Sequence, residues 1–353
     1  MASPMHELRR SPTRGTVLLT GASGLVGQAL LDALGHHDVI CLSHRTPVNR
    51  PGVATVHGDL MQPNLGLDDD EYRSLAKSID AIIHCAAVTD FNRRDGSLET
   101  TNVQGTEKIV ALADAADARL YHVSTAFLHA KADGDRGRTA VGYADSKRAA
   151  EDLVQASSVP HVMLRPSVVI GDSRTGAVSA FQGLYLVAGA IFAGLVPLIP
   201  FDPTWPIDFL PCDVVADAIA AVVDHELTSG EFWITAGTKA LSLDRAVGLC
   251  VGLANELGKP VDKPRFVPPE MFDRLIAPVF LESLPLRIRR TVVRLLDFFA
   301  AYLCLDGALP SDLDRMGELG AKPLPDQEAT LLTSLRYWAE ATRKVKRPRA
   351  EVA

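Results

Sequence analysis

The stretch VLLTGASGLVG, residues Val17–Gly27, decides the fold of this chain. A short apolar run ends in a glycine-rich turn, and a helical segment follows at once. Gly21 permits the tight turn, Gly24 leaves room for a pyrophosphate, and Gly27 allows the helix to pack closely on the strand. The free N–H groups at the start of such a helix bind phosphate. The stretch therefore predicts a nucleotide-binding strand–turn–helix unit.

Strands and helices are expected to alternate along the first half of the chain. We expect strands at Thr16–Leu19, Val39–Leu42, Ala54–Val56, Ala81–His84, Leu120–Val123 and His161–Leu164. Helices are expected between them, for example at Leu25–Leu34 and Asn102–Ala116. This alternation predicts an α/β fold with a Rossmann-type doubly wound parallel sheet.

The pattern becomes irregular after Pro166, where several prolines follow one another. Beyond them we expect a helix at Val214–His225, a strand at Glu231–Ile234 and a helix at Ser242–Leu257. These elements predict a smaller, mostly helical C-terminal region that binds the substrate.

A second motif, YADSK, places Lys147 four residues after Tyr143. On a helix that spacing puts both side chains on one face. A nearby cation favours the phenolate, so we expect Lys147 to lower the pKa of Tyr143 and to make the phenol a general acid near neutral pH. Upstream, an apolar strand ends in Ser124-Thr125, where a hydroxyl can hydrogen-bond a substrate carbonyl. The candidate catalytic residues are thus Thr125, Tyr143 and Lys147. Taken alone, the Tyr-x-x-x-Lys spacing also fits a solvated helix face.

With the glycine motif, this pair resembles the extended short-chain dehydrogenases/reductases. Further segments match that family in order: Gly58-Asp59-Leu60, His84-Cys85-Ala86-Ala87, Asn102-Val103-Gln104-Gly105-Thr106 and Arg165-Pro166-Ser167. The resemblance spans roughly residues 15–240 and is specific because the matches keep their order. It implies the cofactor-binding residues Gly21, Ser23, Gly24, Leu25, Val26, Gly27, His44, Arg45, Asp59, Leu60, Ala86, Ala87, Tyr143, Lys147, Pro166, Ser167 and Val168.

A narrower resemblance points to the male-sterility branch of that family. It rests on four segments: HVSTAF from His122, GYADSK from Gly142 with Glu151 beyond it, RPSVVIGDSRTG from Arg165, and PIDFLPCDVVADAI from Pro206. The branch holds fatty acyl reductases and the thioester-reductase domains of carboxylic acid reductases and peptide synthetases. It implies NADPH-dependent reduction of an acyl thioester, bound to a carrier protein or coenzyme A, or of the corresponding aldehyde. Hydride would attack the carbonyl carbon while Thr125 and Tyr143 stabilise the oxygen, and Lys147 would bind the nicotinamide ribose.

The end of the second strand bears on the choice of cofactor. NAD binders usually place an acidic residue there, and NADP binders place a cation for the 2′-phosphate. Here the strand ends CLSHR, residues Cys41–Arg45, without an acid. Arg45 is a permanently charged planar fork suited to phosphate, but His44 occupies the register of the arginine of the male-sterility pattern. We expect NADP(H) to be preferred, with NAD(H) possible, and leave open which residue contacts the phosphate.

Composition agrees with an enzyme that acts in the cytoplasm. The 36 Lys and Arg residues against 43 Asp and Glu residues give a net charge of −7, which argues against a nucleic-acid partner. The five cysteines are scattered, and no pair has zinc-like spacing, so we expect neither a metal nor a disulfide framework. That cysteine usage favours a reducing compartment.

The expected organisation places the NADP-binding Rossmann domain at residues 15–176, with residues 207–240 returning to it. Residues 177–206 and 241–340 would form the substrate-binding region. Residues 1–14 would be a flexible tail without the apolar stretch of a signal peptide, and residues 341–353 a basic tail. A basic tail of this kind is usually solvated, although it could also contact an acidic carrier protein or anionic lipid.

Two apolar segments have alternative interpretations. Gly183–Ile199 carries no charge but falls short of the roughly 18 apolar residues of a membrane span. We expect it to be a helix lining an apolar pocket, rather than a membrane-embedded segment. Leu281–Leu303 is expected to be a helix packed on the core, with a lid over an acyl chain or an interfacial helix as alternatives.

Other functions remain open from the sequence. One is an alcohol or ketone dehydrogenase, or a nucleotide-sugar epimerase, of the same extended family. An epimerase needs a polar pocket, for which Gly183–Ile199 is too apolar. Another is a non-catalytic nucleotide-sensing regulator, which need not keep Tyr143 and Lys147. Because 353 residues leave no room for a carrier or adenylation domain beside this fold, we expect a carrier protein to act in trans.

Overall fold

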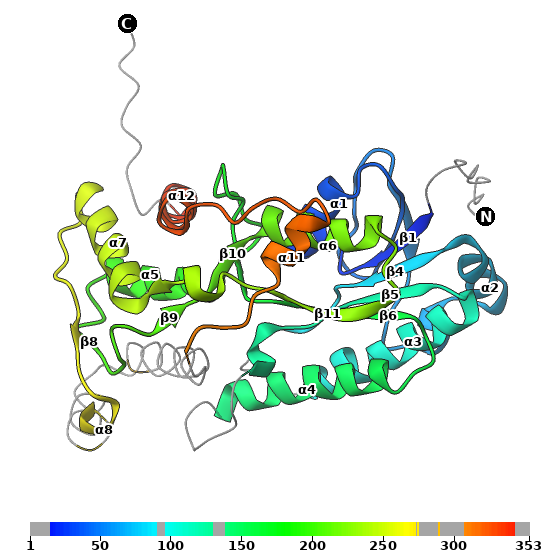
Figure 1. Cartoon of the computed structure of the whole chain (residues 1–353), viewed down its shortest axis with the longest axis horizontal. Helices are drawn as coiled ribbons and strands as arrows, with labels where there is room; N and C mark the ends of the chain where they lie inside the picture. Colours follow the sequence, from blue (N-terminus) through cyan, green and yellow to red (C-terminus); the bar gives the residue numbers. More distant parts are fainter. Residues whose placement is uncertain are drawn as a thin grey trace, which may run out of the picture.

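The computed structural model describes residues 15–89, 96–129, 138–272, 274, 289 and 307–342. A sheet of seven parallel strands runs through its centre (Figure 1). The strands are β1 (Thr16–Thr20), β2 (Asp38–Ser43), β3 (Ala54–His57), β4 (Ala81–His84), β5 (Arg119–Val123), β6 (His161–Pro166) and β11 (Ser229–Ile234). Their order, β11-β6-β5-β4-β1-β2-β3, reverses between β1 and β4. In a doubly wound sheet, ligands bind beyond the carboxyl ends of the strands at that reversal.

Helices cover both faces of the sheet, which confirms the predicted doubly wound fold (Figure 1). One face carries α1 (Leu25–Ala33), α6 (Cys212–Asp224) and α11 (Leu313–Glu318), and the other carries α2 (Asp69–Ser78), α3 (Gly105–Ala116) and α4 (Arg138–Gln155). The five inner strands are buried along both faces, as parallel strands between two helical layers should be, whereas the edge strands β3 and β11 are partly exposed. The apolar side chains of the two faces form separate clusters, with Leu19 in one and Leu18 in the other.

Two segments differ in detail from the elements expected. The predicted helix at Asn102–Ala116 begins earlier, as a π-helical turn over Glu99–Gln104 that leads into α3. Strand β6 extends to Pro166, and the chain then forms β7 (Val168–Ile170), which pairs in parallel with β10 (Phe209–Pro211). Proline is tolerated at this strand end because it need not donate to the ladder.

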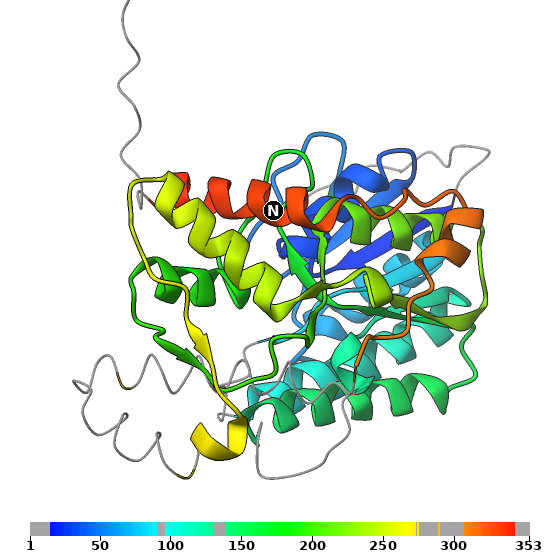
Figure 2. The ribbon, with the colours of Figure 1, turned by 60° about the vertical axis from the view of Figure 1, so that its left-hand side comes forward.

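A second, mostly helical region lies at the far end of the molecule from β3 (Figures 1 and 2). It contains α5 (Leu184–Phe192), α7 (Leu243–Glu256) and α12 (Gln327–Ala341), together with the short α8 (Pro269–Met271). Two short strand pairs complete it: β8 (Leu198–Ile199) with β13 (Arg265–Phe266), and β9 (Pro206–Ile207) with β12 (Leu241–Ser242). This region has an apolar cluster of its own, in which Phe192 meets Trp338 edge to face.

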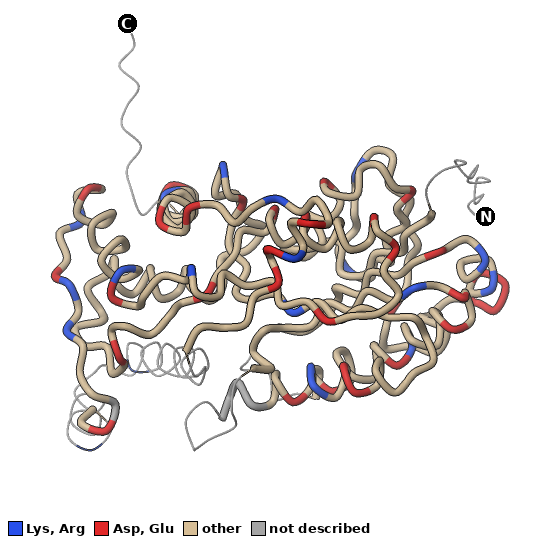
Figure 3. The backbone as a smooth tube through the Cα atoms, in the orientation of Figure 1, with Lys and Arg blue, Asp and Glu red and all other residues tan. Residues whose placement is uncertain are grey.

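Acidic and basic residues are interspersed over the described part of the molecule (Figure 3). No helix among the described residues is long and apolar enough to cross a membrane. Cys41, Cys85, Cys212 and Cys250 are free thiols. The two predicted tails, apart from Ala341 and Thr342, and the predicted helix Leu281–Leu303, apart from Arg289, lie outside the described residues.

Candidate active site

The glycine turn after β1 has the geometry that its sequence predicts. Gly21 has a φ of +73°, and a Cβ there would lie 2.6 Å from the Ala86 backbone nitrogen. A Cβ on Gly27 would overlap the carbonyl oxygen of Gly21, so only glycine allows α1 to begin this close to the strand. Gly24 has nothing but that same oxygen nearby and is the N-cap of α1, with no side-chain cap. The first amides of α1 therefore stay open to an anion, and the turn fits a pyrophosphate.

The other predicted cofactor-binding residues follow strands of the sheet at the same carboxyl edge. The turn after β1 supplies Ser23, which is exposed, and the first turn of α1 supplies Leu25 and Val26, which are half-buried. The set continues with Asp59 and Leu60 after β3, Ala86 and Ala87 after β4, and Pro166, Ser167 and Val168 at the junction of β6 and β7.

Two basic side chains follow the end of β2, and they differ in their contacts. His44 Nε2 lies 3.5 Å from Asp59 Oδ2, while Asp59 Oδ1 accepts from the Met61 amide at 2.9 Å. Arg45 is exposed, and among the described residues it makes no hydrogen bond or ion pair. Of the two candidates for a phosphate, Arg45 is thus the one that keeps its donors available.

Thr125, Tyr143 and Lys147 come together where β5 and α4 meet. Tyr143 and Lys147 lie one turn apart on α4, and both side chains are buried. The Tyr143 hydroxyl shares a hydrogen bond with the Thr125 side chain. Thr125 follows the end of β5 and is 4% exposed. Because both Tyr143 and Lys147 are buried, the alternative of a solvated helix face is wrong.

The expectation that Lys147 lowers the pKa of Tyr143 is wrong for this structure. Burial raises the pKa of Tyr143 to about 12, against a lowering by its hydrogen bond with Thr125. Lys147 Nζ donates to the Val123 carbonyl at 3.0 Å and lies 3.4 Å from His122 Nε2, so the ammonium is held at the strand. Burial also lowers the pKa of Lys147 to about 8. The phenol therefore keeps its proton at neutral pH, as a general acid requires.

A hydrogen-bond network fixes the helix that carries the tyrosine. Asn102 Oδ1 accepts from the Val88 amide at 2.8 Å, and its Nδ2 donates to Ser146 Oγ at 3.0 Å. Ser146 Oγ donates in turn to the Tyr143 carbonyl at 2.8 Å. Asn102 is buried, and it joins the loop after β4 to α4.

A buried histidine holds the glycine turn against the same loop. Thr20 Oγ1 lies 2.8 Å from His84 Nδ1 and accepts from the Ala86 amide at 3.1 Å. His84 Nε2 lies 3.1 Å from the Thr106 hydroxyl, which itself donates to Asn102. Thr106 therefore accepts from Nε2–H, and Thr20 donates to Nδ1. Burial, with the nearby Lys147, lowers the pKa of His84 to about 3, so the ring is neutral.

An ion-pair cluster lies one helical turn beyond Lys147. Arg165 donates to both oxygens of Glu151, at 2.9 and 2.5 Å, and to Glu231 at 2.6 Å. Its guanidinium also lies 4.8 Å from the Trp233 ring centroid. Arg165 and Glu151 are both buried, so this bidentate pair binds α4 to β6. The pair fixes where α4 packs against the sheet, and hence the position of Tyr143.

Three residues near the site belong to the motifs quoted above, yet the sequence assigns them no role. Cys85 lies close enough to Tyr143 and Lys147 to affect both pKa values, and burial raises its own pKa to about 11. His122 is the neighbour of Lys147. Asp208 accepts from the amides of Ala236 and Gly237 at 2.9 and 2.8 Å. The sequence of an apolar strand does not reveal which side its polar residue faces. It therefore held no signal for His122, which lies in β5, or for Cys85, which directly follows β4.

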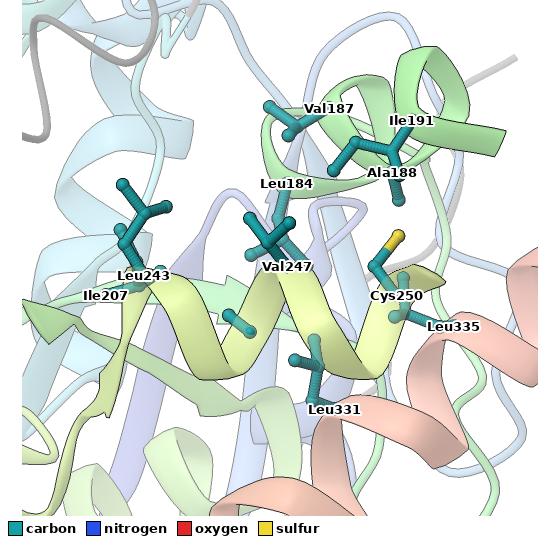
Figure 4. Close-up of a pocket in the computed structure, with 11 residues that line it drawn as sticks. Leu184, Val187, Ala188, Ile191, Ile207, Leu243, Val247, Cys250, Leu331 and Leu335 are labelled. Atoms are coloured by element: carbon teal, nitrogen blue, oxygen red, sulfur yellow. The ribbon is translucent and has the colours of Figure 1, made fainter. Parts of the chain in front are cut away.

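The helical region contains an apolar cavity of about 50 Å³ (Figure 4). Side chains from α5, α7 and α12 surround it, and none of them is charged. The lining consists of Leu184, Val187, Ala188, Ile191, Ile207, Leu243, Ala246, Val247, Cys250, Leu331 and Leu335. The prediction that the segment after Gly183 forms a helix lining an apolar pocket is confirmed, although this cavity is well below the roughly 300 Å³ of small ligand sites.

Comparison with known proteins agrees with this architecture. The fold and the glycine turn are those of a Rossmann-type, nucleotide-binding α/β protein. The family model described as male sterility protein matches residues 41–219. The chain belongs to this family.

The similar curated proteins are much longer than this chain. It is 32% identical over 247 residues to the hybrid PKS-NRPS synthetase LUC5 of Fusarium sp, a match that covers 61% of this chain and 6% of that protein. It is 30% identical over 257 residues to a component of the linear gramicidin synthase of Brevibacillus parabrevis, covering 60% of this chain and 5% of that protein. The chain thus corresponds to a small part of each synthetase.

Solved structures share the fold. The terminal R domain of the myxalamid PKS-NRPS pathway superposes with a TM-score of 0.74 at 23% identity, covering 96% of this chain and 94% of that one. A UDP-glucose 4-epimerase superposes with a TM-score of 0.62 at 16% identity, covering 94% of this chain and all of that one, 100%. At these identities the likeness concerns the fold alone.

Proposed function

We propose that this protein is an NADPH-dependent reductase of hydrophobic acyl thioesters, or of the aldehydes that they yield. The observation that supports it most is the buried group of Thr125, Tyr143 and Lys147 at the carboxyl edge of the sheet, next to an open glycine turn. Membership of the male sterility family and the similarity to synthetases favour a thioester over other carbonyl compounds.

The residues of the site would act on the carbonyl oxygen. Thr125 and Tyr143 already share a hydrogen bond, so both hydroxyls can turn toward one acceptor. Bound NADPH supplies a hydride to the carbonyl carbon. Tyr143 gives its proton to the oxygen as negative charge develops there. From a thioester this yields a hemithioacetal, which loses the thiol and becomes an aldehyde.

Lys147 has a supporting role in this proposal. Its ammonium is held by the Val123 carbonyl on the strand that leads to Thr125. We assign it to the nicotinamide ribose and to the electrostatic balance of the site, since a positive charge beside Tyr143 stabilises the phenolate left after proton transfer.

We assign the 2′-phosphate of the cofactor to Arg45. His44 is drawn toward Asp59, whereas Arg45 has no partner among the residues described around it. A guanidinium binds phosphate in a bidentate fashion. The assignment favours NADPH over NADH.

The acyl group would lie against the helical region. Helix α5 is apolar over most of its length, and its Leu186 is 61% exposed. The cavity between α5, α7 and α12 is too small to hold an acyl chain by itself, so a chain would have to run over α5 or open this packing. We propose delivery of the acyl group by a carrier protein or coenzyme A; one of the similar solved structures is a thiolation-reductase di-domain from an archaeal non-ribosomal peptide synthetase.

A substrate screen tests the proposal. NADPH oxidation is followed with acyl-coenzyme A and acyl-pantetheine thioesters, aldehydes, ketones and UDP-sugars of matched concentration. We expect turnover of thioesters or aldehydes that rises with chain length to a limit. A UDP-sugar converted faster than every apolar carbonyl compound would replace the proposal with an epimerase.

A further inference from the structure

A second cluster of functional groups lies at the opposite edge of the sheet from the glycine turn. His36 and His37 occupy the turn between α1 and β2, and Asp224 is the last residue of α6. Helices α1 and α6 pack side by side (Figure 1). Both helices therefore end at the amino edge of the sheet, which brings together residues that are 187 and 188 positions apart.

The two imidazoles converge on one carboxylate oxygen. Asp224 Oδ1 lies 2.8 Å from His36 Nε2 and 2.6 Å from His37 Nε2. The three ligand atoms all lie within 4.8 Å of one another. The His37 side chain is 10% exposed, and its Nδ1 is buried without a partner among the described residues. Within the described residues, Nε2 is thus the ring atom through which His37 is hydrogen-bonded, and the ring also contacts that of His36, with the centroids 4.5 Å apart.

The cluster opens into a polar cavity of about 270 Å³. Asp80, Arg119 and Glu226 also line it. Two of these groups are already engaged with each other, because Arg119 donates to Glu226 at 3.2 Å. Asp80 accepts from the Thr16 amide at 2.7 Å. The cavity therefore has an excess of carboxylates, while the Asp224 carboxylate remains with the two imidazoles.

We propose that His36, His37 and Asp224 bind a divalent transition-metal ion of the Zn²⁺ type. Two imidazoles with one carboxylate form a donor set that suits Zn²⁺, Ni²⁺ or Cu²⁺. Ligand atoms around a tetrahedral Zn²⁺ lie roughly 3.4 Å apart, given bonds of about 2.1 Å. The observed separations at Asp224 Oδ1 are shorter by less than 1 Å, so small rotations of the partly exposed His36 and Asp224 side chains suffice. The cavity leaves the fourth position to water.

The bound ion would have a structural role, because no residue of the candidate active site lies at this edge of the sheet. It would join the turn before β2 to the end of α6, two segments of the same helical layer. Binding to the folded chain alone adds to the free energy of unfolding in proportion to the logarithm of ion concentration. Protons compete for the imidazole nitrogens, so binding should weaken as pH falls.

The test is metal titration of the full chain, purified without a histidine tag and treated with EDTA. Calorimetry with ZnCl₂ at pH 7.5 should give one site per chain, with weaker binding at pH 5.5. His37→Ala and Asp224→Asn should each weaken the site by at least about tenfold, the lower range for a loss in or around a metal shell. His225→Asn removes an imidazole next to Asp224 whose one hydrogen bond within the described part of the chain is to the Ala221 carbonyl, and should leave binding unchanged.

Thermal unfolding supplies a second readout. Zn²⁺ should raise the Tm of the unmodified protein and of His225→Asn, and leave the Tm of Asp224→Asn unchanged. Each variant's NADPH affinity shows that it is folded. Absence of binding at 1 mM ZnCl₂, or equal affinity in all four proteins, would overturn the proposal and leave the cluster as an ion pair shared by two histidines.

Discussion

The carboxyl edge of the sheet and the helical region beside it are built on different principles. At the edge, several buried polar side chains are paired with one another: Tyr143 with Thr125, Asn102 with Ser146, His84 with Thr20 and Thr106. In the helical region, side chains around the cavity between α5, α7 and α12 are apolar and make no directional bonds. Buried polar networks hold one geometry, because each unpaired group would be costly.

We infer from this contrast that the carboxyl edge and the helical region serve different purposes. A proton donor must stand within hydrogen-bond distance of its acceptor, so the edge has to be fixed. A surface that selects acyl groups needs only shape and apolar contact, which tolerate repacking. We therefore expect changes at the edge to affect turnover and cofactor affinity, and changes around the cavity to affect the choice of substrate.

The largest effect is expected from Tyr143→Phe. This substitution removes the hydroxyl that donates the proton and leaves the rest of the side chain in place. We therefore expect kcat to fall by about 10²-fold or more. NADPH affinity, measured by fluorescence titration, should stay nearly unchanged. Tyr121→Phe is a matched control, because that hydroxyl is buried without a partner among the described residues; its removal should leave kcat unaltered. Full activity in Tyr143→Phe would remove the phenol from the mechanism.

A pH profile tests the charge of Lys147. Burial lowers the pKa of this ammonium to about 8, so raising the pH through that value removes the positive charge from the site. We expect kcat/KM to fall by up to about tenfold per pH unit above the pKa, and Lys147→Arg, which stays charged, to move the decline to higher pH. An unmodified protein whose rate is level from pH 7 to 10 would contradict this role.

The same lysine makes a prediction for stability. Its pKa is about 8 in the folded chain against 10.5 ordinarily, so between these values the unfolded chain binds more protons. The free energy of unfolding should therefore rise with pH over that window. Denaturant titrations at pH 8 and pH 10 should show a smaller rise in Lys147→Met than in the unmodified protein, and an equal rise would show that Lys147 is not the group responsible.

A smaller effect is expected at the end of β2. Arg45→Asp removes a charge-assisted contact of about 1.5–3 kcal/mol, or about 10- to 100-fold in NADPH affinity, and should change NADH affinity much less. His44→Gln sharpens the assignment, because a histidine drawn to Asp59 should matter little. If His44→Gln costs more than Arg45→Asp, the phosphate contact belongs to the histidine.

The smallest effect belongs to the cavity. Val247→Ala enlarges it by two methyl groups, which should favour longer acyl chains by about fourfold per added methylene, given about 0.8 kcal/mol for each buried CH₂. Val251→Ala is the control on the same helix, since Val251 is buried but does not line the cavity. Chain-length profiles of kcat/KM distinguish them, and identical profiles would place the acyl chain elsewhere.

The sequence predicts the sheet and the catalytic group because both depend on local patterns. Six of the seven strands and the helices α1 and α3 follow from apolar runs, and the seventh strand, β11, is predicted near its true bounds. The π-helical turn at Glu99–Gln104 is not predicted, because it arises from tertiary contacts that draw Asn102 toward Val88 and Ser146.

The sequence could not predict the direction in which side chains point or the distances between them. It places Lys147 on the face of Tyr143 but does not reveal its bond to the Val123 carbonyl, so the predicted sign of the pKa shift of the phenol is wrong. Burial is the largest influence on the pKa of Tyr143, and the Lys147 ammonium is held at the Val123 carbonyl. The sequence gives no sign of the cluster at Asp224 either, because two adjacent histidines become informative only once the fold brings a carboxylate beside them.

The central claim is that this site reduces a thioester with NADPH, and the most direct measurement follows the released thiol. Acyl-pantetheine and NADPH are mixed with the protein, and free thiol, NADPH and aldehyde are quantified together in single samples. The account predicts one thiol released for each aldehyde formed or further reduced, with at least one NADPH consumed per thiol, and loss of all three signals in Tyr143→Phe. Thiol release without NADPH consumption, or none with any acyl chain while ketones or UDP-sugars react, would contradict it.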